Sequence, residues 1–430
     1  MKKINSYKEA TNVITRISQI TSLRNFQDWR KNKFKFVCSW LYDIFILCLY
    51  TYTKYNFDTY MLHQMPYNSE RAMITFLKYV FIIGFLILAI LSLYHSKNTV
   101  MLMKEIDKVD ENLQKLGCAV EYRSLYIHVV LVGLFWFLSA FILSTIYIKW
   151  LVSFGQTLYL YHLCSTLSYV YGTNVASIVL YDFKIYVYWL GHRFKQTNEL
   201  LRTFLVEGHQ IKTEDTVVEK SNVLNKRFRL DRWLSEHSIH RSRVLPLSHP
   251  LNIKHESQSV KKVHLLQQIR FVHLQLCGVS KMVNRIFNGQ LIVYVAMTLT
   301  YITIILYYLY TEVYKPETFL SKLSVITVLL IEVLSYCVKI ALVSYNCEYT
   351  TNQANRTIEI IHACSVYDID TELKDEILQF SLQMSHTQLG KSKSAYFRLN
   401  YSFIRDCISF VATYLVIMIQ WNQTVYSINE

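Results

Sequence analysis

The stretch Thr413-Tyr414-Leu415-Val416-Ile417-Met418-Ile419-Gln420-Trp421 decides the fold of this chain. Five apolar residues lie between a Thr-Tyr pair and a Gln-Trp pair. A helix that crosses a bilayer needs about 20 predominantly apolar residues, and the segment 401–421 that contains this stretch meets that requirement. An amide inside lipid is costly unless it meets a partner or water. Gln420 therefore indicates a helix interface or a water-filled path.

Six more segments of similar character precede this one. The four prolines of the chain all lie between the segments, so the helices are expected to run without proline kinks. No alternation typical of a transmembrane β-barrel is present. The sequence predicts an all-α, polytopic membrane protein with seven transmembrane helices, at residues 36–52, 74–94, 125–148, 158–188, 291–310, 323–344 and 401–421.

Composition supports the same class of protein. Apolar residues make up 52% of the chain and charged residues 18%, with 33 tyrosines. In a soluble protein, a net charge of +14 would suggest that the protein binds nucleic acid. Here the positions of the basic residues along the chain explain the net charge better, so no nucleic-acid partner is expected. The nine cysteines form no CxxC pair, and no P-loop, HExxH or GxGxxG motif occurs. We therefore expect no enzyme activity, no cofactor and no metal site.

The basic residues are distributed asymmetrically between the two sides of the predicted membrane. Thirty-six Lys and Arg residues fall in the N-terminal segment and in every second connection, against five in the other set. Basic residues favour the cytosolic side. The sequence therefore predicts a cytosolic N-terminus and, with seven spans, an extracellular C-terminus. This orientation is the reverse of that in a G-protein-coupled receptor.

The connection between the fourth and fifth spans is the longest. Its part 207–262 is polar and predicts a flexible cytosolic insertion. From residue 263 onward, apolar residues recur at spacings of three and four, which indicates an amphipathic helix whose apolar seam must be buried. The predicted organisation is 1–35 cytosolic segment, 36–190 spans one to four, 191–290 cytosolic extensions with the insertion, 291–344 spans five and six, 345–400 cytosolic anchor segment, 401–421 last span and 422–430 extracellular tail.

The stretch that ends in Gln420-Trp421 resembles TYhhhhhQF, the C-terminal signature of insect gustatory receptors, with Trp421 where that family usually has Phe. Two other regions are similar to the same family. They are Arg193-Phe194 with Asn198, followed by His273-Leu274-x-Leu276-Cys277 with Asn284 and Gln290, and Phe380 with Gln383.

This resemblance implies a taste receptor that acts as a tastant-gated, non-selective cation channel in the plasma membrane of chemosensory neurons. It implies a homotetramer, or a heterotetramer with related receptors, in which the last helix lines the pore. The alternatives are a channel subunit like the insect odorant receptors or, further away, a G-protein-coupled receptor. The major sugar-receptor branch typically has Glu where this chain has Leu415. Bitter and fructose-like tastants both remain open.

Four residues of the last span are candidates for the pore and gate: Thr413, Ile417, Gln420 and Trp421. They fall on one helix face at spacings of three and four. From the residues alone, a helix packed inside one subunit is the favoured interpretation, with Gln420 bonded to a neighbour. The resemblance favours a pore lining instead.

Five residues are candidates for ligand binding: Tyr161, His162, Tyr301, Thr327 and Glu332. They belong to the outer halves of the predicted spans, where hydroxyls and aromatic rings are dense enough for a small amphipathic molecule. Glu332 lies near the middle of its span and is costly to bury. An internal salt bridge, for example to Lys78, is an equally good explanation for it, and an interfacial tyrosine belt explains some of the rings.

Overall fold

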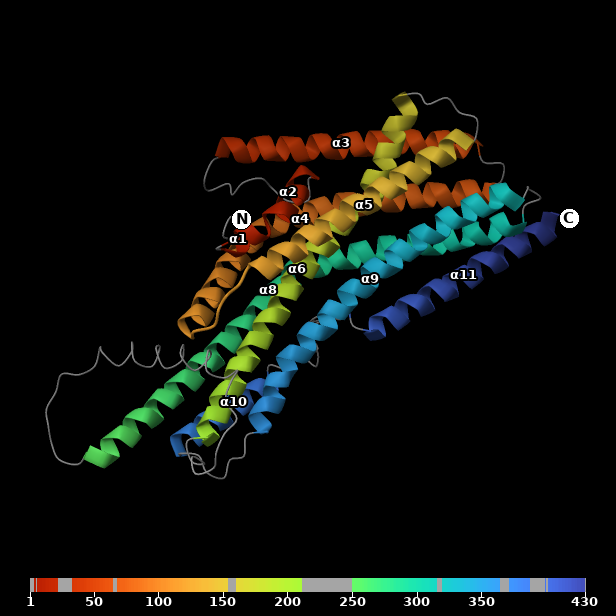
Figure 1. Cartoon of the computed structure of the whole chain (residues 1–430). Coiled ribbons are helices and arrows are strands. Elements are labelled where there is room, and N and C mark those ends of the chain that lie inside the picture. Colours follow the sequence, from red (N-terminus) through yellow and green to blue (C-terminus); the bar gives the residue numbers. More distant parts are fainter. Residues whose placement is uncertain are drawn as a thin grey trace.

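The fold consists of helices, and the described residues include no strand. The structure is a computed structural model (Figure 1). It describes residues 4, 6–21, 33–64, 68–153, 160–210, 250–314, 319–363, 371–386, 399 and 401–429.

In this described part, seven helices have 29 residues or more. They contain the seven predicted spans, except that residues 158 and 159 of the fourth span lie outside the described residues. Five of them, α4, α5, α8, α9 and α11, are long and apolar enough in their described residues to cross a membrane. The long helices are α3 (Lys33–Gln64), α4 (Asn68–Lys115), α5 (Arg123–Ser153), α6 (Leu160–Gln210), α8 (Pro250–Tyr314), α9 (Phe319–His362) and α11 (Tyr401–Asn429). The shorter ones are α1 (Tyr7–Ala10), α2 (Asn12–Ile20) and α10 (Thr371–His386).

Several helices are much longer than a bilayer requires. With 65 residues, α8 measures about 98 Å at 1.5 Å per residue. Figure 1 shows α6, α8 and α9 extending together past the other long helices, with α10 near their ends. We call residues 191–210, 260–290, 345–362 and α10 the helical base.

The predicted apolar seam of α8 forms the core of the helical base. Every seam residue is buried within the single chain, which confirms that the spacing marks an inward-facing helix side. The seam residues are Leu266, Ile269, Val272, Leu276, Val279, Val283 and Ile286.

The structure changes the limits of two predicted segments, the insertion at 207–262 and the last span. α8 begins at Pro250, so residues 250–262 of the expected insertion are helical, because proline is well suited to the first turn of a helix. Residues 207–210 of the insertion are the end of α6, which runs to Gln210, and the remaining part, 211–249, lies outside the described residues. α11 continues to Asn429, beyond the predicted end at 421, since no Pro or Gly interrupts it.

The N-terminal helices pack against α6. The Tyr7 ring stacks on Tyr186 at 5.8 Å and meets Trp189 edge-on at 5.9 Å. Ser18 donates a hydrogen bond to Asp182 Oδ2 over 3.0 Å. The N-terminal segment is thus part of the folded helical assembly.

A glycine positions the connection between α4 and α5. Gly117 has φ of +78°, a left-handed conformation that glycine adopts at little cost. Its N–H bonds to the Gln114 carbonyl at 2.9 Å, and the Cys118 N–H bonds to the Leu113 carbonyl at 3.0 Å. This pair of bonds is a Schellman motif, which ends α4 and directs the chain toward Tyr122.

Candidate functional site

The structure brings two of the predicted ligand-binding residues into direct contact. Tyr301 of α8 donates a hydrogen bond from its phenol oxygen to Glu332 Oε1 of α9 over 2.6 Å. Both side chains are buried. A short bond to a charged acceptor is stronger than one between neutral groups, so this pair joins α8 to α9 in the transmembrane part of the fold.

Aromatic rings surround the pair. The Tyr301 ring meets Phe81 of α4 at 5.5 Å, with the ring planes at 86°, and Tyr336 of α9 at 5.2 Å, with the planes at 65°. A second group of rings lies close by on α3, α4 and α6, where Tyr50 contacts Phe85 at 4.9 Å and Tyr171 at 5.6 Å. Rings with polar tips around a buried carboxylate can bind a small molecule through both stacking and hydrogen bonds.

Basic side chains also reach this region. Lys78 lies over the Tyr55 ring at 3.6 Å and donates a hydrogen bond to the Tyr55 carbonyl oxygen over 3.3 Å. Lys339 lies 4.8 Å from the Tyr336 ring centroid. Sequence reasoning considered Lys78 as a partner for Glu332 and did not include Lys78 or Lys339 among the candidate ligand-binding residues.

The other three predicted ligand residues are not seen in this cluster. Thr327 is exposed, and its hydroxyl donates to the Leu323 carbonyl oxygen of its own helix over 2.7 Å. Tyr161 and His162 belong to the first turn of α6, but their side chains lie outside the described residues.

The rest of the chain buries little of α11. Only 6% of its apolar stretch is buried within the chain. The four predicted pore residues Thr413, Ile417, Gln420 and Trp421 are all exposed, Trp421 at 73%. The interpretation of a helix packed inside one subunit is therefore wrong: α11 contacts α8 and α9 but is not enclosed by them.

In the helical base, the residues of the other two motifs meet one another. The His273 ring lies between Phe194 of α6, at 5.3 Å, and Phe380 of α10, at 6.1 Å. All three side chains are buried. Residues that are distant in the sequence thus form one aromatic stack, which connects α6, α8 and α10.

Polar contacts connect α6 to α9 and α8 to α10 in the helical base. Asn198 donates to the Gln353 carbonyl oxygen over 2.7 Å and accepts from the Thr357 hydroxyl over 2.6 Å. Arg270 of α8 forms an ion pair with Glu376 of α10 at 3.0 Å. The base is therefore held by directional bonds as well as by apolar packing.

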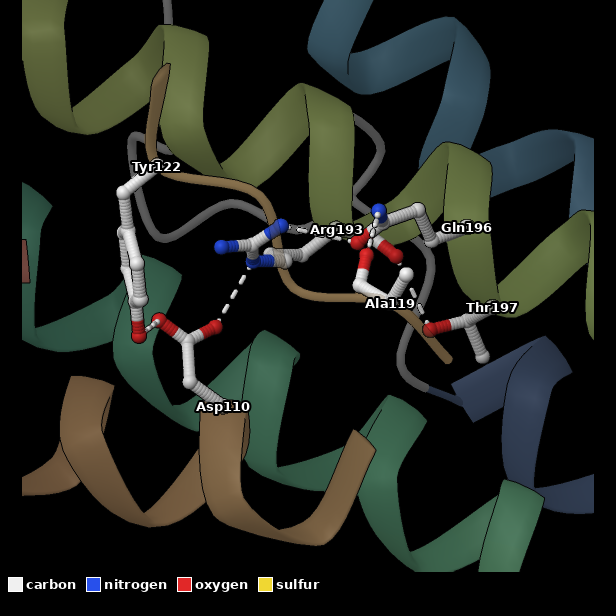
Figure 2. Close-up of polar contacts among 6 residues, drawn as sticks. All are labelled: Asp110, Ala119, Tyr122, Arg193, Gln196 and Thr197. Atoms are coloured by element: carbon white, nitrogen blue, oxygen red, sulfur yellow. Dashed lines mark hydrogen bonds and ion pairs between the residues drawn. The ribbon is translucent and has the colours of Figure 1, made fainter. Parts of the chain in front are cut away.

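A buried ion pair connects α4 to α6 at the edge of the base (Figure 2). Arg193 Nε lies 2.7 Å from Asp110 Oδ1, and both side chains are almost completely buried. Tyr122 donates to Asp110 Oδ2 over 2.7 Å. Arg193 also donates to Gln196, which in turn donates to the Ala119 carbonyl oxygen over 3.3 Å. The network fixes the α4–α5 connection against α6.

The protonation state of Tyr122 is consistent with its hydrogen bond to Asp110. Its burial, and next the negative charge of Asp110, raise the pKa of the Tyr122 phenol. The phenol therefore remains protonated, and able to donate, at physiological pH. Sequence reasoning singled out Arg193 but neither Asp110 nor Tyr122. The signal in the sequence that could have identified Asp110 was its position next to the apolar seam of α4, which includes Ile106 and Val109.

Comparison with known proteins agrees with this arrangement. The family model described as 7tm Chemosensory receptor matches residues 11–425. Gustatory receptor 28a of Drosophila melanogaster is 24% identical over 323 residues, which are 74% of this chain and 68% of that receptor. The Drosophila gustatory receptor for bitter taste 66a is 27% identical over 190 residues, 42% of this chain and 35% of that receptor.

A solved structure shows the same fold. The insect olfactory receptor OR5 from Machilis hrabei, determined in complex with eugenol, matches with a TM-score of 0.52 and 11% identity, over 96% of this chain and 97% of that one. Such receptors are multi-pass membrane proteins rather than enzymes, as the sequence predicts. The chain belongs to the 7tm Chemosensory receptor family, whose members include insect gustatory receptors.

Proposed function

We propose that this protein is a taste receptor that acts as a tastant-gated, non-selective cation channel in the plasma membrane of chemosensory neurons. In this proposal four subunits surround a pore, as a homotetramer or with related receptors. The relatives by sequence are gustatory receptors, one of them named for bitter taste. Their names support taste, whereas the likeness to an olfactory receptor concerns the fold.

The exposure of α11 is the observation that carries the proposal. A helix with both threonine and glutamine on one face and large apolar residues on the others is poorly suited to stand alone in lipid. Assembly around an axis would place Thr413, Ile417 and Gln420 against water and against the same helix of other subunits. Alternating polar and apolar levels suit a narrow pore.

We assign the gate to Gln420 and Trp421. Four Trp421 side chains near one axis would exclude water and close the pore by dewetting. Rotation or splaying of α11 would replace these rings with Gln420, whose amide both donates and accepts hydrogen bonds.

The ligand is proposed to enter from outside into a pocket among the predicted spans three to six, which are α5, α6, α8 and α9, and to contact some of Tyr161, His162, Tyr301, Thr327 and Glu332. The Tyr301–Glu332 bond connects two helices, and α11 packs against the same two. Binding shifts the gate only if the ligand has a higher affinity for the open arrangement.

Expression of the chain alone in oocytes, with voltage-clamp recording against a panel of bitter compounds and sugars, tests this function. The proposal predicts an inward cation current for at least one compound. The matched control is Gln420→Ala at equal surface expression, with a reduced evoked current. The proposal is contradicted if protein at the cell surface gives no current with any compound, both when the chain is expressed alone and when it is co-expressed with a related receptor.

A further inference from the structure

At the predicted cytosolic ends of the third and fourth spans lies a group of basic and aromatic side chains that the proposed channel does not use. The His128 ring of α5 stacks on the Tyr188 ring of α6 at 3.9 Å, with the ring planes at 1°. The Tyr188 ring also meets His192 at 4.5 Å, and its hydroxyl lies 3.4 Å from Ser124 Oγ. These contacts hold the first turns of α5 against α6, which continues past them into the helical base (Figure 1).

A buried lysine belongs to the same group. Lys184 lies one turn before Tyr188 on the same side of α6, and its side chain is 7% exposed. It lies near enough to His128 for its charge to act on the imidazole ring. Among the described residues, its ammonium group has no hydrogen bond and no ion pair. A buried ammonium is costly unless a compensating charge or an acceptor lies close to it.

The carboxylates along these two helices do not compensate Lys184. α5 contains no acidic residue. Asp182, the nearest acidic residue along α6, accepts a hydrogen bond from Ser18 of α2, and side chains two residues apart on a helix do not face each other. The ionisable groups that act on His128 are Lys184 and His192, which are both basic. Within the described part of the chain, this contact between α5 and α6 is therefore positively charged.

A ring nitrogen next to the lysine has unused hydrogen-bonding capacity as well. The Nε2 atom of His128 is buried and has no hydrogen-bond partner in the described part of the chain. An imidazole can donate from this atom, and an ammonium group has three donors. A water molecule would accept from both groups, but it would leave the charge of Lys184 uncompensated. An anion with several oxygen atoms satisfies both the charge and the donors.

The surroundings of the group indicate where such an anion comes from. The rest of the chain buries only 22% of the apolar stretch of α5. Large apolar side chains at spacings of three and four form an exposed stripe that begins beside His128: Ile127, Leu131, Leu134 and Leu138. Arg123 is exposed at the start of the same helix. The predicted orientation places this end of α5 at the inner leaflet, whose lipids carry negative charge.

We infer that an anionic phospholipid of the inner leaflet binds here, with its phosphate group between α5 and α6 and its acyl chains along the exposed stripe of α5. Lys184 and His128 donate to the phosphate oxygens, since bonds between charged groups are the strong ones. His128 and Tyr188 are only partly buried, so the lipid reaches the site beside these rings. The inference uses the predicted orientation, but it depends on neither the proposed pore nor the tastant site.

The test compares a phospholipid with the same molecule without its phosphate. The full-length chain, purified in detergent and depleted of lipid, is titrated with dioctanoyl phosphatidate and separately with dioctanoylglycerol. Thermal unfolding is followed by tryptophan fluorescence, because a ligand that binds the folded state raises the unfolding temperature. We expect a rise with phosphatidate and none with dioctanoylglycerol. Inorganic phosphate, titrated separately, should give no rise, because it lacks the acyl chains.

Substitutions locate the effect. Lys184→Met and His128→Phe keep side chains of similar shape but remove the donors, and each should weaken phosphatidate binding about tenfold. Lys184→Arg should retain binding, because a guanidinium also donates to phosphate. Lys281→Met is the matched control, because it removes the same charge from an exposed position of α8.

Several results would overturn the inference. They are equal rises with phosphatidate and dioctanoylglycerol, no rise with either, or phosphatidate binding that is unchanged in both Lys184→Met and His128→Phe. A rise with inorganic phosphate equal to that with phosphatidate would assign the site to free phosphate instead of a lipid. The wild-type comparison decides even if a variant fails to fold. No current is measured, so a failure of the proposed channel leaves the lipid site unaffected.

Discussion

Tyr301 and Glu332, 31 residues apart and on different helices, share a 2.6 Å hydrogen bond in the buried transmembrane part of the fold. No local sequence pattern around either residue predicts this pairing. Both helices that carry them also contact α11. A change at this bond therefore has a short structural route to the proposed pore helix.

Removal of the Tyr301 hydroxyl tests the importance of this bond for ligand response. Tyr301→Phe keeps the ring contacts with Phe81 and Tyr336 but leaves Glu332 without this donor. A hydrogen bond to a charged group contributes roughly 1.5–3 kcal/mol; because this bond belongs to the arrangement proposed to bind the ligand, we expect the half-maximal agonist concentration to rise about tenfold when it is lost. Thr300→Val is the control, since that hydroxyl donates to the Ala296 carbonyl oxygen of its own helix. Equal dose–response curves for Tyr301→Phe and wild type would remove the pair from the ligand site.

The Arg193–Asp110 pair should be important for stability. Asp110→Asn removes the charge that compensates a buried guanidinium, at a cost of about 3–5 kcal/mol. Thermal unfolding of the purified protein and its surface expression should both fall. Lys108→Gln on the same helix removes one partner of an exposed pair with Glu105, which should cost less than about 1 kcal/mol. Similar unfolding temperatures for the two variants would contradict a structural role for the buried pair.

The close contact between α6 and α3 leads to a second prediction about stability. A Cβ at Gly172 would collide with the Tyr50 phenol, and Tyr50 is held between Phe85 and Tyr171. Gly172→Ala should therefore destabilise the fold by roughly 1–3 kcal/mol. Gly278→Ala is the matched change in open space, where alanine favours the helix by about 1 kcal/mol. Unfolding temperatures measured side by side should move in opposite directions. A stable Gly172→Ala protein would show that α6 and α3 are not so closely packed.

The asymmetry of basic residues predicts the orientation of the chain. The N-terminal segment and the connections on its side of the membrane carry 36 Lys and Arg residues, and the connections on the other side carry five. Basic residues favour the cytosolic side, so this asymmetry predicts a cytosolic N-terminus. An N-terminal epitope tag should stain only after permeabilisation, and a C-terminal tag should stain on intact cells. Staining of the N-terminal tag on intact cells would reverse the orientation and with it the proposed entry of ligand from outside.

Sequence patterns predicted the parts of the fold that depend on local periodicity. The seam from Leu266 to Ile286 follows the helical repeat, and its burial could be read directly from the spacing. The exposure of α11 could not be read from spacing in this way. It depends on where the other helices of the chain pack, which is a property of the tertiary structure. The residues alone favoured an enclosed helix there, and this was wrong.

The candidate sites were predicted only in part for a similar reason. Glu332 was identified by the cost of burying a carboxylate in lipid, but the choice of Tyr301 as its donor depends on the packing of α8 on α9. Asp110 lies 83 residues from Arg193 in the chain, and no local pattern specifies that distance. Charge pairs between distant helices follow from tertiary structure, which a single sequence does not state.

Recording from purified protein in planar lipid bilayers, without other proteins, tests the central claim most directly. Trp421 is exposed on α11 and is proposed to close the pore. Without ligand, the wild type should be nearly silent, and Trp421→Ala should show unitary openings that pass sodium and potassium similarly. Folded protein that gives no openings in either form, both alone and after reconstitution with a related receptor, would contradict the claim that this chain is a cation channel gated at α11.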